Sequence, residues 1–276
     1  MGMSTTSATT TSPLKPAGGG RASTLSPRRI RALARAELTL LVRNRASLFV
    51  ALLLPVVLTF STKTAAEQAD LSGTGLSVGT AVLPGSVGMV LLFAVYSNLV
   101  GVYVARREEL VLKRLRTGEA NDMEILGAAA LPSVAIGLIQ SAVLLIGGAL
   151  LLEVGAPSRP DLLVAGLLLG TLMMVALAAA SAAVTRSAEL AQLTPMPLML
   201  ATFAGSGLFV PLEVFPDTLA EICRWLPMTP VTDLLRGAWT EQLSGMETLR
   251  ALAVAVGWTV LGAYALRKRF RWEPRR

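Results

Sequence analysis

The sequence predicts an all-α integral membrane protein with six transmembrane helices, because it is rich in apolar residues that gather in long windows. Hydrophobic residues make up 53 % of the 276 residues and charged residues 16 %, and the mean hydropathy is +0.60. Soluble domains average about 25 % charged residues. A helix of about 20 apolar residues crosses a hydrocarbon core of about 30 Å. The strongly apolar windows lie at residues 46–62, 82–104, 125–152, 162–184, 191–211 and 248–266.

The first window is short, contains Pro55 and follows the basic residues Arg43 and Arg45. A basic stretch followed by an apolar one is also the order found in a signal peptide, but signal peptides occupy about the first 15–30 residues. We therefore expect a transmembrane helix at 46–62, with local thinning of the bilayer compensating for its short length. The residues before it at 1–25 are rich in Ser, Thr, Pro and Gly and lack an apolar face, which predicts a disordered tail.

The distribution of Lys and Arg predicts which way the chain faces. With six spans, both termini lie on the same side as the loops at 105–124 and 185–190, and this side carries 20 of the 25 Lys and Arg residues. The remaining five are Lys63, Arg159, Arg224, Arg236 and Arg250. Because short cytoplasmic loops carry the excess of Lys and Arg, we expect a multi-pass protein of the cell membrane with both termini in the cytoplasm. The net charge of +7 then indicates contact with anionic membrane lipid rather than with nucleic acid.

A dense run of charge separates the second window from the third. Residues 105–120 read ARREELVLKRLRTGEA and contain eight charged side chains, each of which opposes burial in a bilayer by about 2.5–3.5 kcal/mol. The apolar residues Val111, Leu112 and Leu115 fall on one helical face. The run therefore predicts a short amphipathic helix on the cytoplasmic surface, and a solvated connector is the simpler alternative.

Several residue types that transport or catalysis would need are missing. The five later windows have no charged residue in their interiors, and the chain has no His and no Gly-Lys pair, so it lacks a Walker A motif. A single cysteine, Cys223, excludes an internal disulfide and a multi-cysteine metal site. We expect no catalytic residues and no metal, so energy for uphill transport would have to come from another chain.

A few small and polar residues inside the windows are candidates for specific roles. Asn98, Gln140 and Ser206 are candidates for lining a substrate path, with interhelical hydrogen bonding as the alternative. Gly166 and Gly170 form a GxxxG pattern, which lets helices approach closely within one chain or between two copies.

The segment at 205–239 predicts two short helices before the last span. Residues 218–221 (Thr-Leu-Ala-Glu) match a capping box that would open a helix through Trp225, with Asp217 as an alternative N-cap. After two prolines, residues 231–240 form a second, amphipathic piece. Both are too short to span, so we expect them to lie at the outer interface or to re-enter the membrane.

Four stretches and a C-terminal motif follow a recognisable order along the chain. They are PRRIRALARAELTLLVRNR (27–45), LPGSVGMVLLFAVYSN (83–98), REELVLKRLRTGE (107–119), SGLFVPLEVFPDTLAEICRWLPMTPVTDLLRGAW (206–239) and FRWEP (270–274). In this order they resemble the permease subunits of type-2 ATP-binding cassette (ABC) exporters, which include drug, polyketide and polysaccharide exporters. The likeness covers residues 28–276.

The resemblance implies a transmembrane domain at 26–276 with an amphipathic N-terminal connecting helix, a cytoplasmic coupling helix and outer re-entrant helices before the last span. It also implies a homodimer of the permease with two cytoplasmic ABC ATPase subunits. ATP and magnesium would bind to these partners, and this chain would hold no cofactor. Carried over by position, the residues that would couple to the ATPase are Glu108, Leu112, Arg114, Leu115 and Arg116.

The expected function is therefore that of a permease in an ATP-driven exporter of an amphiphilic molecule, such as a drug, an antibiotic or a lipid. Closure of the ATPases would push the helix around 107–117 and tilt spans one, two and five against the other copy. Multidrug or antibiotic resistance would be the biological setting. The alternative is a membrane scaffold or sensor that recruits an ATPase without transporting anything.

Overall fold

A computed structural model of the chain describes residues 77–109, 122–152, 154–208, 215–240 and 243–269, together with Val57, Thr64 and Leu212. The predicted tail, the connecting helix and nearly all of the first span therefore lie outside the described residues. Most of the predicted coupling helix lies outside them as well.

The described ranges consist of helices and turns and contain no strand. The elements in chain order are α3 (Val78–Val90), the π-helix η1 (Leu91–Ser97), α4 (Asn98–Glu108), α6 (Asp122–Leu151), α7 (Pro160–Val184), the 3₁₀ turn η2 (Leu190–Gln192), α8 (Met196–Gly205), α9 (Asp217–Cys223), α10 (Thr229–Thr240) and α11 (Gly245–Arg269). The chain is thus all-α in this part, as its apolar windows predict.

Four of these helices are long and apolar enough to cross a membrane. They are the continuous rod of α3, η1 and α4 (Val78–Glu108), then Glu124–Leu151, Pro160–Val184 and Gly245–Lys268. They correspond to the second, third, fourth and sixth apolar windows. Local signals explain where they begin: the side chains of Ser77 and Thr80 form a capping box at α3, and Pro160 occupies the first turn of α7.

The expected fifth span at 191–211 is not one continuous helix. The window holds the end of η2 and then α8, which is only 10 residues long. Pro195 is the N-cap residue of α8 and Pro197 lies in its first turn, where the N–H that proline lacks would have no helical partner. Both prolines therefore favour a helix that begins at Met196. At the other end the chain turns at Gly207, whose φ of +66° is a left-handed conformation that favours glycine.

The short helix α9 also differs from its prediction. It begins at Asp217, and the N-cap position belongs to Pro216, which makes no side-chain hydrogen bond. The capping box of Thr218 and Glu221 is therefore wrong, and so is Asp217 as an N-cap. The backbone N–H groups of the first turn bond instead to the carbonyl of Pro216, and Glu221 forms a surface ion pair with Arg224 at 2.8 Å.

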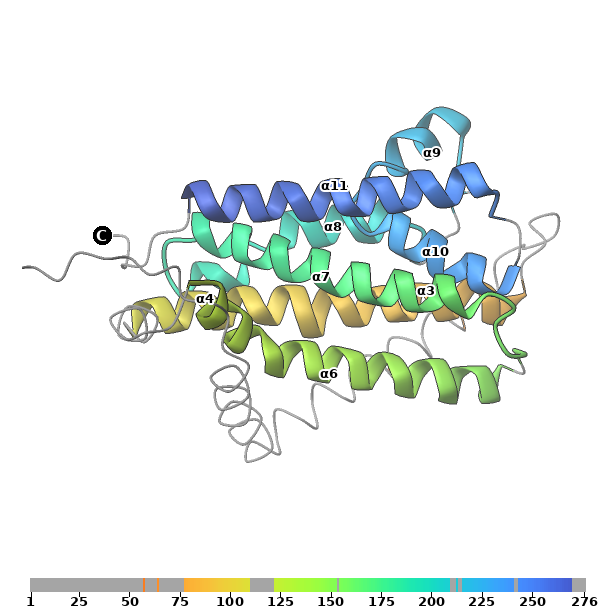
Figure 1. The fold of residues 1–276 in the computed structure, drawn as a ribbon, viewed down its shortest axis with the longest axis horizontal. Helices are drawn as coiled ribbons and strands as arrows, with labels where there is room; N and C mark the ends of the chain where they lie inside the picture. Colours follow the sequence, from red (N-terminus) through yellow and green to blue (C-terminus); the bar gives the residue numbers. More distant parts are fainter. Residues whose placement is uncertain are drawn as a thin grey trace, which may run out of the picture.

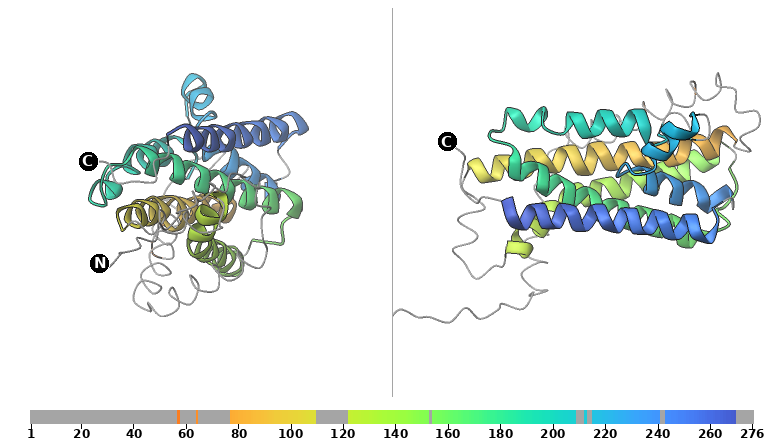
Figure 2. Two further views of the ribbon diagram at one scale, coloured as in Figure 1. Left: turned by 60° about the vertical axis from the view of Figure 1, so that its left-hand side comes forward. Right: turned by 90° about the horizontal axis from the view of Figure 1, so that it is seen from above.

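The long helices lie side by side along the length of the molecule (Figure 1). Helix α7 packs against α11, α10 and the α3–α4 rod, and α10 lies among α3, α7 and α11. Figure 2 shows α8 beside the α3–α4 rod, where the rings of Phe203 and Phe93 are in contact, with their centroids 5.7 Å apart. Helix α9 projects from the bundle next to α11 (Figure 1).

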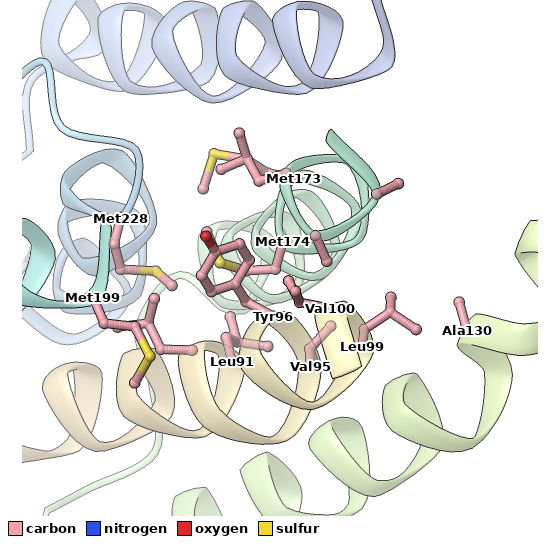
Figure 3. Packing of buried hydrophobic residues seen from close by; sticks show 14 of the residues in the cluster. Leu91, Val95, Tyr96, Leu99, Val100, Ala130, Met173, Met174, Met199 and Met228 are labelled. Carbon is pink, nitrogen blue, oxygen red and sulfur yellow. The ribbon is translucent and has the colours of Figure 1, made fainter. Parts of the chain in front are cut away.

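The buried core lies where η1, α7 and the segment before α10 meet. Figure 3 shows Tyr96 between Met174 of α7 and Met228, with Met199 of α8 close to Leu91. All five side chains are at most 8 % exposed. Unbranched methionine fills irregular gaps of this kind well, so η1, α7, α8 and the segment before α10 pack together through apolar and aromatic side chains.

Helices α7 and α11 cross closely at one point. A Cβ atom placed on Gly262 of α11 would lie 2.9 Å from the carbonyl carbon of Ala176 in α7 and 3.0 Å from its oxygen. Because these are backbone atoms, they cannot move aside as the end of a side chain can. The contact therefore requires glycine at position 262.

We expect Gly262→Ala to push α11 away from α7 and to destabilise the protein by about 1–3 kcal/mol, the usual cost of overpacking. The measurement is thermal unfolding of the detergent-solubilised chain. Gly257→Ala on the same helix is the matched control, since a Cβ there meets open space and alanine is the better helix former. Equal unfolding midpoints for the two variants would contradict the close crossing.

Candidate functional site

The last turn of α4 carries a buried arginine. Arg107 is 0 % exposed, and its guanidinium donates hydrogen bonds to the carbonyls of Ala182 at 3.0 Å and Thr185 at 2.6 Å. These carbonyls belong to the end of α7, where no further helical N–H is available to them and where the helix dipole is negative. Arg107 therefore supplies both the missing donors and a favourable positive charge, and it joins α4 to α7.

The next residue joins α4 to the turn that follows α7. Oε1 of Glu108 accepts a hydrogen bond of 2.8 Å from the backbone N–H of Ala188. The turn at 185–189 connects α7 to η2. Two consecutive residues of α4 thus hold the end of α7 and the turn beyond it, one by donating and the other by accepting.

Helix α4 is also fixed to α6, on another side. The hydroxyl of Tyr103 donates a hydrogen bond of 3.0 Å to the carbonyl of Leu126, and the amide of Asn98 donates one of 3.1 Å to the hydroxyl of Ser133. The two bonds run in opposite order along the two helices, so α6 lies antiparallel to α4. The segment at 110–121 therefore joins the neighbouring ends of two antiparallel helices.

The predicted coupling residues can be placed only in part. Glu108 ends α4 and is exposed, although one of its carboxylate oxygens is engaged within the chain. Leu112, Arg114, Leu115 and Arg116 lie outside the described residues.

Two of the three candidate substrate residues, Asn98 and Ser206, lie at different levels along the α3–α4 rod. Asn98 is exposed and follows the π-helix η1, bonding its own N–H to the carbonyls of Phe93 and Val95. Gln140 is 2 % exposed and Ser206 is 0 % exposed. The turn that contains Ser206 lies against Gly85, which is about 20 Å along the rod from Asn98.

The turn after α8 is held by α10. The hydroxyl of Thr232 donates a hydrogen bond of 2.8 Å to the carbonyl of Ser206, and the guanidinium of Arg236 donates one of 3.1 Å to the carbonyl of Gly207. Thr232 is 0 % exposed and Arg236 is 5 % exposed. As at α7, buried side chains supply donors to carbonyls at the end of a helix.

The glycines of the GxxxG pattern face α10 of the same chain. A Cβ on Gly166 would lie 3.2 Å from Cβ of Leu234, and one on Gly170 would lie 2.8 Å from Cγ1 of Val231. Small residues here let α7 and α10 approach closely. This face of α7 is therefore occupied within one chain.

Sequence reasoning missed the roles of Arg107 and Arg236. It placed Arg107 in a charged run outside the bilayer and Arg236 among the outer charges. A signal existed for Arg107, because it follows Tyr103 by four residues and Tyr96 by eleven, so all three fall on one helical face. In the described part of the chain, no group of three or more Cys, Asp or Glu side chains is placed to hold a metal ion.

We expect Gly85→Ala to displace the turn at 206–208, because a Cβ at this position would fall onto the carbonyl group of Leu208. The only cysteine of the chain, Cys223, is buried and its sulfur lies against Gly205, so displacement should make it react faster with a maleimide. Gly101→Ala in the same rod is the control, since a Cβ there meets open space. Unchanged labelling in Gly85→Ala would contradict the close approach.

Comparison with known proteins identifies the family of the chain. The profile of the family described as ABC-2 type transporter matches residues 28–239, whereas no curated protein matches the chain significantly. The match covers well over half of the chain and runs from before α3 to the next-to-last residue of α10. Members of this family form the membrane-embedded part of ABC transporters. The chain therefore belongs to the ABC-2 type transporter family and is a membrane permease subunit of an ABC transporter.

Proposed function

We propose that this permease exports an amphiphilic molecule from the cytoplasm, using the energy of a separate ATPase subunit that binds the charged segment at 110–121. The observation that carries the proposal is the position of this segment. It joins the adjacent ends of α4 and α6, and α4 is in turn hydrogen-bonded to α7 through Arg107. A force applied to the segment would therefore act directly on the helices of the permease.

The sequence supports a separate ATPase. The chain has no Gly-Lys pair and hence no Walker A motif with which to cradle nucleotide phosphates. The Lys and Arg excess on the side of 110–121 supports a cytoplasmic position for this segment and for both termini. ATP and magnesium would then be bound by the partner.

The substrate class is inferred from the surfaces that the helices offer. Large apolar side chains are exposed on α6, α7 and α11, for example Val143, Leu168 and Val260. Asn98, the first residue of α4, is an exposed polar residue. Such surfaces suit a molecule with apolar and polar parts. Gln140 and Ser206 are buried, so they would meet a substrate only after helices separate.

A second copy of the chain would complete the transporter. Since Gly166 and Gly170 pack against α10 of their own chain, the second copy would use other apolar faces, and membrane lipid would cover the remainder. A substrate path would then run between the copies.

The first test is to tag the chain in its native membrane, extract it in mild detergent and identify the proteins that co-purify. We expect an ATPase with a Walker A motif, and we expect the double substitution Arg114→Ala and Leu115→Ala to release it. The physical reason is that the amphipathic segment would lose both an apolar contact and a charge. The readout is the amount of ATPase per tagged permease.

The matched control is the double substitution of Leu219→Ala in α9 and Arg224→Ala at its C-cap. It removes the same residue types from an exposed helix that would face away from the cytoplasm, so ATPase binding should not change. Absence of an ATPase from the intact complex would contradict the proposal. If the ATPase binds but cells are equally sensitive to amphiphilic antibiotics with and without this binding, the result would instead favour a scaffold or sensor.

A further inference from the structure

The end of α4 makes two consecutive charged contacts to the same neighbouring stretch of backbone. Arg107 donates to the carbonyls of Ala182 and Thr185, and Glu108 accepts from the N–H of Ala188. The contacts of 2.6 Å and 2.8 Å have the short lengths of charge-assisted hydrogen bonds. The charged groups of Arg107 and Glu108 are thus directed toward the end of α7 and its following turn.

We infer that Arg107 and Glu108 are positioning residues that make α4 and α7 move as one body, so that a push on segment 110–121 reaches the fourth span. The inference rests on the proposed function, since it takes the push to come from an ATPase. It changes the expected role of Glu108, which would act inside the permease rather than at the ATPase surface. It also adds the fourth span to the elements expected to tilt.

The path continues beyond α7. Tyr96 is within hydrogen-bonding distance of Ser181, at 3.0 Å, so the rod and α7 are joined at a second level. Helix α10 packs closely on Gly166 and Gly170 of α7, and it holds the turn at 206–208. Contiguous packed elements of this kind are the physical means by which one site can bias another.

The guanidinium of Arg107 suits this role better than an ammonium would. Its planar fork can donate to two carbonyls at once, whereas a lysine presents a compact point charge. Both carbonyls lie at the end of α7, so one side chain is enough to hold that end against α4. Glu108 then fixes the turn that follows, which leaves the end of α7 little freedom to move separately.

The test uses hydrogen–deuterium exchange on the full-length chain in lipid nanodiscs. Glu108→Ala should speed exchange of the amide of Ala188 about tenfold, because it removes a hydrogen bond to a charged group. Glu108→Gln keeps a carbonyl oxygen as acceptor but loses the charge, so exchange of the Ala188 amide should be slower than in Glu108→Ala and no slower than in the wild type. Glu109→Ala is the control, since it removes the neighbouring carboxylate, which is also exposed.

The second arm uses the complex with its co-purified ATPase, trapped with magnesium, ATP and vanadate. In the wild type and Glu108→Gln, trapping should change exchange across the last turns of α7. In Glu108→Ala the ATPase should remain bound while this response is lost. Arg107→Lys should weaken the response, because one ammonium cannot hold both carbonyls of α7 in the same way.

Three outcomes would overturn the inference. The amide of Ala188 could exchange at the same rate in Glu108→Ala as in Glu109→Ala, which would show that the contact between Glu108 and Ala188 does not stabilise the turn. Glu108→Ala could speed exchange of the Ala188 amide and yet leave the change of exchange in α7 on trapping intact, which would show that no movement is transmitted through this contact. Glu108→Gln could release the ATPase, which would make Glu108 a direct charged contact to the partner. If no ATPase binds the wild type, the proposed function fails, whereas the first arm still reports on the contact itself.

Discussion

A helix that ends among apolar surroundings leaves carbonyl groups without donors, and the rest of this structure depends on how those groups are satisfied. Two buried arginines meet the need at two helix ends: Arg107 at the end of α7 and Arg236 just after α8. Each comes from a different helix from the one it serves, so the same bonds that satisfy the backbone also join helices. Carbonyl dipoles at these helix ends help to make the burial of each positive charge tolerable.

Close packing between helices also determines the architecture. Apolar helices in a bilayer gain little from hiding apolar surface from one another, so small residues and shape decide which faces meet. Helix α7 receives α10 at Gly166 and Gly170 and meets Gly262 of α11 through the backbone of Ala176. As a result α7 lies at the centre of the bundle, in contact with the α3–α4 rod, α10 and α11. A movement of α7 would reach each of these elements.

Two residues of the charged run after the second window form bonds within the protein. Arg107 and Glu108 bond to the end of α7 and the turn beyond it, and the segment at 110–121 joins α4 to α6. Hydropathy treats the whole run as one polar stretch. Arg107 follows Tyr103 by one helical turn, which would have placed it on the buried face. At α11, Ser244 and Glu247 form a capping box, which the Ser-x-x-Glu spacing also signals. Both features were within reach of the sequence.

The sequence by itself determined the all-α membrane character, four of the long helices and the family, because apolar windows and motif order are written in neighbouring residues. It determined equally that residues 231–240 form an amphipathic helix, which is α10 in the fold. Only the tertiary structure decided that α8 ends at Gly205, that α9 starts after Pro216 and that Gly166 and Gly170 face α10. The start of α9 rests on the carbonyl of Pro216 next to it. The end of α8 and the neighbours of Gly166 and Gly170 depend on which atoms from distant parts of the chain satisfy a backbone group or fill a space. Local sequence patterns do not identify those partner atoms.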